Sequence, residues 1–268
     1  MKERLLAQYD PVIRHKAIEK LVVRQVGDVQ ERKYWRFRYG RWYGGIVTAD
    51  AIGCGLFCKF CWVSDPIMFG PADVGEFYTP ERVAEILIRM AKRRSLDKVR
   101  VSGAEPTIGR EHLLSLLEHF EDEGLLFILE TNGILLGSDK SYAKALSNMP
   151  FLHVRVSLKG CNEKEFSLLT GAKPEGFKLQ LDALKNLLDY GVSCHPAVMA
   201  SFSSQQSLLQ LSERLKEISR DLVENLEIEY VILYPNVRRK ISKHRLKYYR
   251  AYTPEGLIIE PEIYGNEG

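Results

Sequence analysis

The run Gly53-Cys54-Gly55-Leu56-Phe57-Cys58-Lys59-Phe60-Cys61-Trp62 places three cysteines within eight residues. Thiolates are the soft ligands that hold iron–sulfur clusters, and a four-iron cluster needs four ligands. Three cysteines therefore leave one iron without a protein ligand. An open coordination position is typical of a metal site that binds a small molecule and takes part in catalysis.

A zinc site and disulfide bonds are two other uses of clustered cysteines. A closed structural zinc site needs four ligands, usually arranged as two separated pairs. No histidine nearby completes such a set, because the next one along the chain is His112. Disulfide pairing would leave one of the three cysteines unpaired, and the spacings are short. We therefore interpret the run as an iron–sulfur site.

The composition is that of an ordinary soluble globular protein. The chain has 268 residues, of which 45% are hydrophobic and 27% charged, and its length suits one large domain or two small ones. Its longest apolar runs fall far short of the roughly 20 residues that cross a bilayer. Residues 1–6 lack the apolar stretch of a secretory signal. We expect a cytoplasmic protein with no membrane partner, in a compartment where thiols stay reduced.

Downstream of the cysteine run, short β-branched segments alternate with longer segments of helical periodicity. This alternation is typical of parallel strands joined by crossover helices. The pattern predicts strands at residues 45–52, 97–102, 125–130, 152–158, 192–199 and 226–233. It predicts helices that begin after Thr79 and at residues 110–123, 138–148, 175–190 and 204–220. A right-handed series of this kind forms an open barrel or a doubly wound sheet, and composition does not separate the two.

Polar motifs follow three successive predicted strands. They are Ser102-Gly103-Ala104-Glu105-Pro106, Glu130-Thr131-Asn132-Gly133 and Ser157-Leu158-Lys159. In parallel barrels the chemistry lies where strands end and the following loops begin. A lysine at such a position can pair with a carboxylate, and a serine can hold a hydroxyl group. These strand ends are therefore candidate binding residues.

The spacing C-x3-C-x2-C, followed directly by an aromatic residue, resembles the signature of the radical S-adenosylmethionine (SAM) superfamily. The resemblance implies a 4Fe-4S cluster on Cys54, Cys58 and Cys61, with SAM bound at the open iron. It also favours an α/β fold with a partial, TIM-like (β/α)6 barrel. The barrel would occupy residues 45–234, between an N-terminal extension of residues 1–44 and a C-terminal tail of residues 235–268.

The same resemblance implies which residues contact SAM. The run Gly103-Ala104-Glu105-Pro106 is similar to the superfamily's Gly-Gly-Glu-Pro motif, which binds the SAM amino group. Ser157 stands where pyruvate formate-lyase activating enzymes have aspartate, whereas Lys159 matches them. The implied cofactor-binding residues are Phe60, Gly103, Ala104, Glu105, Thr131, Asn132, Ser157, Lys159 and Val198, the last facing adenine from the fifth strand.

The motifs most resemble those of compact glycyl-radical-enzyme activases and 7-carboxy-7-deazaguanine synthases, and Cys61-Trp62 is also similar to wybutosine-forming tRNA enzymes. The resemblance implies reductive cleavage of SAM to a 5′-deoxyadenosyl radical that abstracts hydrogen from a substrate, with ferredoxin or flavodoxin as reductant. Activase-like glycyl radical formation is our first expectation. Modification of a tRNA base, a deazapurine or another small metabolite stays open.

A further hypothesis, from another class, is a non-catalytic iron–sulfur protein for electron transfer or sensing. Such a protein needs no SAM pocket. The presence of Gly103, Glu105, Asn132 and Lys159 therefore argues against it.

Two segments mix basic with aromatic residues, at positions 32–43 and 238–250. Such a mixture suits a nucleic-acid surface, where cations neutralise phosphates and rings stack on bases. It suits equally a positively charged rim for a small anionic substrate, or a role in solubility alone. Protein and tRNA thus both stay candidate substrates.

Three residues near the strands are expected to be structural: His195, Cys161 and Cys194. Two thiols cannot hold a four-cysteine auxiliary cluster. Cys161 follows Lys159 and Gly160 closely, so it is also a candidate hydrogen donor.

Overall fold

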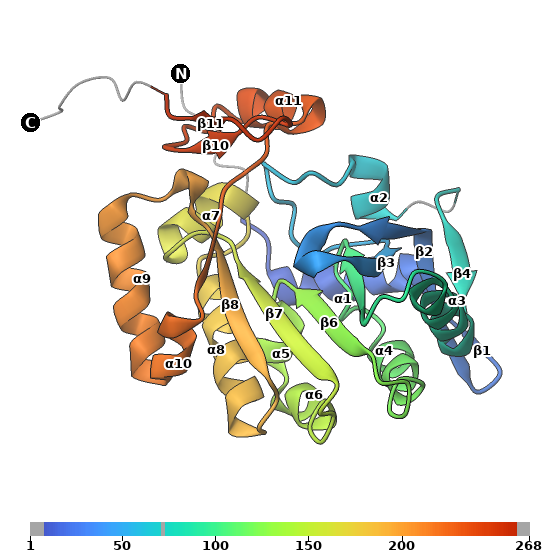
Figure 1. The fold of residues 1–268 in the computed structure, drawn as a ribbon. Helices are drawn as coiled ribbons and strands as arrows, with labels where there is room; N and C mark the ends of the chain where they lie inside the picture. The colour runs from blue at the N-terminus through green and yellow to red at the C-terminus, as the bar shows by residue number, and fades with distance from the viewer. Residues whose placement is uncertain (1–7, 71–72, 262–268) are drawn as a thin grey trace, which may run out of the picture.

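Six parallel strands form the centre of the computed structural model, which describes residues 8–70 and 73–261 (Figure 1). Each pairs in parallel with the next along the chain. In order they are β3 (Ile46–Ala51), β5 (Lys98–Gly103), β6 (Leu126–Thr131), β7 (Leu152–Leu158), β8 (Cys194–Met199) and β9 (Glu227–Glu229). The α/β fold with its six predicted strands is confirmed. β9 is shorter than predicted because Val231 and Leu233 instead hydrogen-bond to Tyr252 of the C-terminal segment.

Helices connect these strands and cover the outer face of the sheet (Figure 1). Thr79 caps the first of them as predicted, since its side chain accepts a hydrogen bond from the Arg82 amide. The helices are α3 (Pro80–Arg93), α4 (Arg110–Glu118), α5 (Ile134–Ser138), α6 (Lys140–Ala145), α7 (Glu163–Thr170), α8 (Glu175–Asp189), α9 (Gln205–Ile218) and α10 (Arg220–Glu224).

The helix predicted at residues 138–148 is wrong in extent. Asp139 has extended backbone angles, and its side chain accepts a hydrogen bond from the Ser141 amide. It therefore ends α5 and caps α6, which divides the segment into two short helices. The helix predicted at residues 110–123 ends earlier, at Glu118, because the following residues form tight turns, with His119 donating to Leu116 and Phe120 to Leu117.

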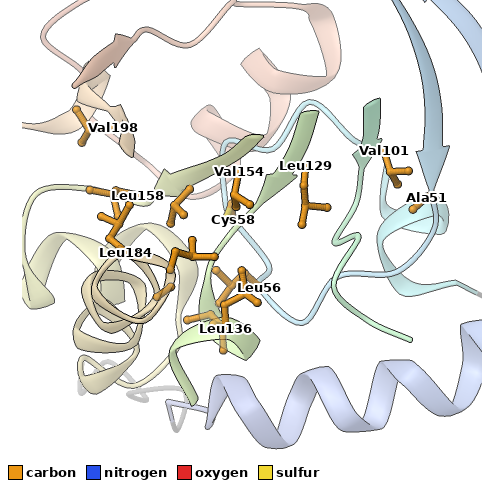
Figure 2. Close-up of a cluster of buried hydrophobic side chains, with 14 of the residues drawn as sticks. Ala51, Leu56, Cys58, Val101, Leu129, Leu136, Val154, Leu158, Leu184 and Val198 are labelled. Carbon is orange, nitrogen blue, oxygen red and sulfur yellow. The ribbon is translucent and has the colours of Figure 1, made fainter. Parts of the chain in front are cut away.

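Apolar residues alternate with polar ones along the parallel strands, and the apolar set forms the core. Val99 and Val101 of β5, like Val154 and Val156 of β7, are almost completely buried. Figure 2 shows the side chains of this core, including Leu129, Val198 and Leu184 of α8. Each fully buried side chain of this size contributes about 1.5–3 kcal/mol. The intervening polar residues face the opposite side of the sheet.

The N-terminal extension enlarges the sheet instead of standing apart from it. It comprises α1 (Pro11–Val22), β1 (Val23–Val26), β2 (Val29–Gly40) and the one-turn helix η1 (Trp42–Gly44). β2 pairs antiparallel with β3, with β1 and with β4 (Glu76–Tyr78). Residues 1–7 of this predicted extension lie outside the described part of the chain.

The C-terminal segment lies over the end of the sheet from which the cysteine loop emerges (Figure 1). It comprises α11 (Pro235–Lys243), β10 (Ala251–Tyr252) and β11 (Ile258–Ile259). The Asn236 amide donates to the Trp62 carbonyl over 2.7 Å, and Lys240 Nζ donates to the Val63 carbonyl over 2.7 Å. These bonds fix the chain between Cys61 and α2 (Asp65–Phe69). In the described residues no helix is both long and apolar enough to cross a bilayer.

Two members of the predicted basic and aromatic surface are internal. Arg32 is 1% exposed and donates to the carbonyls of Ile108, Val22 and Glu105. Burial lowers its pKa to about 10. The Tyr34 hydroxyl, also buried, lies 3.0 Å from His112 Nε2. The expectation of a nucleic-acid surface is therefore wrong for these two residues, because neither can reach a ligand outside the protein.

Replacing Arg32 should destabilise the fold strongly. Arg32→Ala removes the donor shared by three carbonyls, and an unsatisfied buried group costs about 1–3 kcal/mol. We expect the free energy of unfolding to fall by at least about 3 kcal/mol, measured by urea denaturation. The control is Arg24→Ala on β1, whose side chain is 53% exposed in an ion pair with Glu31 and should contribute less than about 1 kcal/mol. Equal losses in the two variants would contradict this role for Arg32.

Candidate active site

A cavity of about 1050 Å³ opens at the carboxyl ends of the parallel strands. All of the predicted site residues except Val198 line it. These are Cys54, Cys58, Phe60, Cys61, Gly103, Ala104, Glu105, Thr131, Asn132, Ser157 and Lys159. Val198 belongs to the alternating set that packs under the helices, and the next residue, Met199, lines the cavity instead. The structure therefore brings together residues from the cysteine loop and three strand ends.

The cysteine loop connects β3 to α2 and is fixed by backbone hydrogen bonds. The amides of Gly53 and Cys54 donate to the carbonyls of Ile67 and Met68 over 2.9 Å each. Within residues 8–70 and 73–261, no three His, Cys, Asp or Glu side chains are grouped so as to hold one metal ion. A cluster does not require such convergence, because each of its thiolates ligates a different iron atom.

The surroundings of the three thiols suit an anionic cluster. Burial raises the pKa of all three, that of Cys58 to about 12, while Lys159 and Lys240 favour the thiolates of Cys58 and Cys61. Cys54 Sγ accepts hydrogen bonds from the Leu56 amide over 3.4 Å and from Asn132 Nδ2 over 3.6 Å. Nearby cations and N–H donors are what thiolates bound to iron need. The residues present therefore fit a three-thiolate cluster.

Glu105 joins the ends of β5 and β6. Its buried carboxylate accepts hydrogen bonds from the Thr107 amide and hydroxyl, from Thr131 Oγ1 and from the Asn132 amide, over 2.6–3.1 Å. An ionised carboxylate has about four acceptor sites, so these bonds use most of its capacity. The Glu105 carboxylate therefore holds together the two cavity-lining segments at the ends of β5 and β6.

Gly103 allows the strand end to lie directly on β3. Its φ of 93° lies in the region that favours glycine, and an added Cβ would lie 2.9 Å from the Ala51 carbonyl oxygen. The next amide, that of Ala104, donates to the same oxygen over 3.1 Å. Ala104, which stands at the second glycine of the resembled motif, thus keeps its backbone at the cavity wall.

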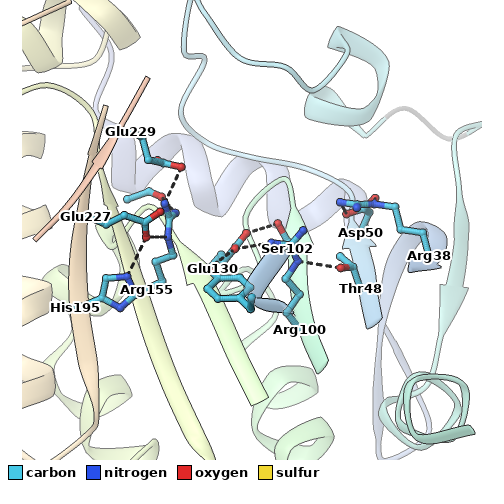
Figure 3. A network of polar contacts seen from close by, with 12 residues as sticks. Arg38, Thr48, Asp50, Arg100, Ser102, Glu130, Arg155, His195, Glu227 and Glu229 are labelled. Atoms are coloured by element: carbon cyan, nitrogen blue, oxygen red, sulfur yellow. Dashed lines mark hydrogen bonds and ion pairs between the residues drawn. The ribbon is translucent and has the colours of Figure 1, made fainter. Parts of the chain in front are cut away.

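Charged residues fill the inner face of the sheet beneath this rim (Figure 3). Arg100 donates to Thr48 Oγ1 over 2.9 Å and to Glu130 Oε1 over 2.6 Å. Burial alone would raise the pKa of Glu130, but Arg100 and Arg155 outweigh it and the pKa is lowered. Glu130 also accepts a hydrogen bond from the Tyr43 hydroxyl over 2.9 Å. Ser102 Oγ donates to the other oxygen over 2.6 Å, so both oxygens of this ionised carboxylate accept hydrogen bonds.

Arg155 forms a second part of the network, toward β9. It lies 2.8 Å from Glu227 and 2.7 Å from Glu229, and donates to Ser157 Oγ over 3.0 Å. His195 Nε2 lies 3.2 Å from Glu227, and contacts with His195 and Arg155 lower the pKa of Glu227 to about 2. His195 thus belongs to the polar network around Glu227.

A β-bulge turns two further arginines into the cavity. The register of β2 on β3 shifts between Tyr34, opposite Ala51, and Arg36, opposite Asp50. Arg36 and Arg38 consequently lie on the Asp50 side, with their Nε atoms 2.6 and 2.7 Å from the same carboxylate oxygen. Asp50 is completely buried, and both arginines line the cavity. Bulges often re-aim side chains next to functional sites.

Part of this network has a signal in the sequence. Arg100 and Arg155 each interrupt a β-branched strand, in Val99-Arg100-Val101 and Val154-Arg155-Val156. A charge within a buried strand indicates either a partner or a site. The bulge that redirects Arg36 and Arg38 has no comparable signal.

Cys161 is 1% exposed and is absent from the residues that line the cavity. Its amide donates to Glu165 Oε2 over 2.8 Å. This placement gives no support to Cys161 as a hydrogen donor. Cys194 is partly buried at the start of β8, away from the strand ends.

A family model described as "Radical SAM superfamily" matches residues 51–202. A curated protein of Pyrococcus horikoshii named "Probable GTP 3′,8-cyclase" is 25% identical over 254 residues, which covers 84% of this chain and 76% of that protein. A Methanocaldococcus jannaschii protein, named as an activating enzyme of glycyl-radical enzymes, is 26% identical over 124 residues, covering 46% of this chain and 43% of its own.

Solved structures share the fold. Streptococcus suis SuiB bound to S-adenosylmethionine superposes with a TM-score of 0.51 at 19% identity. The match covers 66% of this chain and 48% of SuiB, so the chain spans about half the length of that protein. At this identity the likeness concerns the fold alone.

Replacing Glu105 should loosen the strand ends. Charge-assisted hydrogen bonds contribute about 1.5–3 kcal/mol each, so Glu105→Ala should lower the free energy of unfolding by on the order of 3 kcal/mol. Glu111→Ala is the control, because that exposed residue in the first turn of α4 should contribute less than about 1 kcal/mol. Chemical denaturation of both variants tests this, and a Glu105→Ala variant as stable as the control would refute the linking role.

Proposed function

The chain belongs to the radical SAM superfamily, and on that premise we propose that Cys54, Cys58 and Cys61 hold the 4Fe-4S cluster while SAM binds beside them at the strand ends. Enzymes of this superfamily use both cofactors. The observation that carries the proposal is that the three cysteines and the motifs of three strand ends line one cavity. When bound, the cluster and SAM supply a 5′-deoxyadenosyl radical that takes a hydrogen atom from the substrate.

The residues of the strand ends would orient SAM. Lys159 places a cation at the end of β7, where it would pair with the SAM carboxylate. The backbone carbonyls of Gly103 and Ala104 would accept hydrogen bonds from its amino group, whereas that of Glu105 already accepts one from the buried Arg32. Glu105 would act mainly by fixing Thr131 and Asn132, since its oxygens already accept four hydrogen bonds. Phe60 and Met199 would provide apolar contacts at the wall of the cavity.

The charged inner face favours a polar substrate. Barrel interiors of parallel strands are usually filled by branched apolar side chains. Here Arg36, Arg38, Arg100 and Arg155 line the cavity. Arg36 and Arg38 share one buried carboxylate, which leaves a local excess of positive charge. In the described residues the Nη atoms of Arg36 make no hydrogen bond. Guanidinium groups with free donors bind carboxylates and phosphates in two-pronged fashion.

We therefore propose a small anionic substrate whose charged group binds Arg36 and Arg38. The P. horikoshii relative is named for GTP, so a nucleoside triphosphate is the first compound to test. Glycyl radical formation is the second candidate, favoured by the similarity to the M. jannaschii activating enzyme. The tRNA hypothesis has less support because Arg32 and Tyr34 are internal.

Substituting the cysteines tests the cluster assignment. Alanine at Cys54, Cys58 or Cys61 should abolish both the cluster and SAM cleavage, whereas Cys161→Ala and Cys194→Ala should keep about four irons per chain. Iron and sulfide analysis after anaerobic reconstitution, with 5′-deoxyadenosine measured after dithionite reduction, gives the answer. Loss of the cluster in either control variant would show that the ligands are assigned wrongly.

Substituting the arginine pair tests the substrate class. GTP and tripolyphosphate should bind the wild-type protein more tightly than guanosine does, and Arg36→Gln or Arg38→Gln should weaken that binding roughly ten-fold or more, because each removes a charge-assisted hydrogen bond. Calorimetric titration measures the affinities, with citrate as the carboxylate probe and Arg24→Gln as the control outside the cavity.

Citrate and tripolyphosphate distinguish a carboxylate substrate from a phosphate substrate. Preference for citrate would indicate a carboxylate substrate, and preference for tripolyphosphate a phosphate. Binding of guanosine as tight as that of GTP, or no binding of any anionic probe, would overturn the proposal and favour the activase.

A further inference from the structure

We propose that His15 is a positioning residue which, through Asn132, directs an N–H donor at Cys54 Sγ and so raises the reduction potential of the cluster. The inference rests on the proposed function, since it requires Cys54 to ligate the cluster. It concerns a residue outside the strand-end motifs, on the N-terminal helix α1.

The side-chain amide of Asn132 has only one orientation that satisfies its neighbours. Asn132 Oδ1 accepts from the Ile134 amide over 3.0 Å, and a backbone amide can only donate. The nitrogen end therefore faces the other two contacts. These are His15 Nε2 at 3.1 Å and Cys54 Sγ at 3.6 Å.

The tautomer of His15 follows from the same reasoning. His15 Nδ1 lies 2.6 Å from the Pro11 carbonyl oxygen, which can only accept, so Nδ1 carries the proton. His15 Nε2 is then the acceptor for one hydrogen of Asn132 Nδ2. The second hydrogen of the same amide is left to point at Cys54 Sγ. Each bond in this series thus determines the next.

Packing holds the imidazole in place. His15 is 1% exposed, and its ring lies so close to Gly55 that an added Cβ there would collide with Nδ1. Burial also lowers the pKa of His15, in keeping with a neutral ring. The ring therefore contacts the backbone of the cysteine loop on one side and the Asn132 amide at its other nitrogen.

A purely structural role of Asn132 would not change the reduction potential of the cluster, whereas a hydrogen bond to a cluster ligand does. Among the described residues, Asn132 is the one side chain that donates a hydrogen bond to any of the three sulfurs. Hydrogen bonds to cluster sulfurs are one of the factors that set the potential. They stabilise the more negatively charged, reduced state. Removing this donor should lower the midpoint potential.

The test is an EPR-monitored redox titration of the reconstituted full chain without SAM, so that SAM affinity does not enter. Asn132→Ala and His15→Leu should both shift the midpoint potential to lower values. The double variant should match Asn132→Ala alone, because both changes remove the same hydrogen bond. His15→Gln, which offers an acceptor oxygen to Asn132, should restore part of the shift.

The matched control is Asn186→Ala, which removes a buried asparagine bonded to the Leu136 carbonyl over 2.9 Å, on α8. It should leave the potential unchanged. A normal cluster with an unshifted potential in Asn132→Ala or in His15→Leu, or additive shifts in the double variant, would overturn the inference alone. A wild-type chain that holds no cluster would overturn the proposed function together with it.

Discussion

The two-residue period of the parallel strands is the constraint on which this structure depends. On β3, β5, β6 and β7 one set of side chains packs under the helices, and the other faces the cavity. The core set is apolar, whereas the other set contains Arg100, Glu130 and Arg155, which line the cavity, and Asp50, which is buried. Each residue of a strand faces only one side of the sheet. The charged residues therefore pair with residues of neighbouring strands on the same side.

Those partners come from the N-terminal extension and from the last strand of the sheet. Arg36 and Arg38 reach Asp50 from the N-terminal extension, and Arg155 pairs with Glu227 and Glu229 of the last, shortened strand. The salt bridges are partly buried, so they serve orientation more than stability. The result is a polar wall in the cavity that the cysteine loop also lines.

The sequence was sufficient for the parallel strands, the capped helix α3 and the cavity-lining motifs, because each depends on a local pattern. Val198 was misplaced since its neighbour Met199 faces the cavity, a difference of one residue in the strand period. The roles of His15 and of the Arg36–Asp50 contact could not be predicted. Both depend on residues that are distant in the chain or on a bulge, and neither leaves a periodic signal.

The fastening of the cysteine loop by α11 has a consequence for the order of folding. The bonds from Asn236 to Trp62 and from Lys240 to Val63 join residues 174 and 177 positions apart. Contacts of such long range close a large loop of chain, so they form later in folding than the local turns of the cysteine loop. The last step that fastens the segment between Cys61 and α2 is therefore the docking of α11.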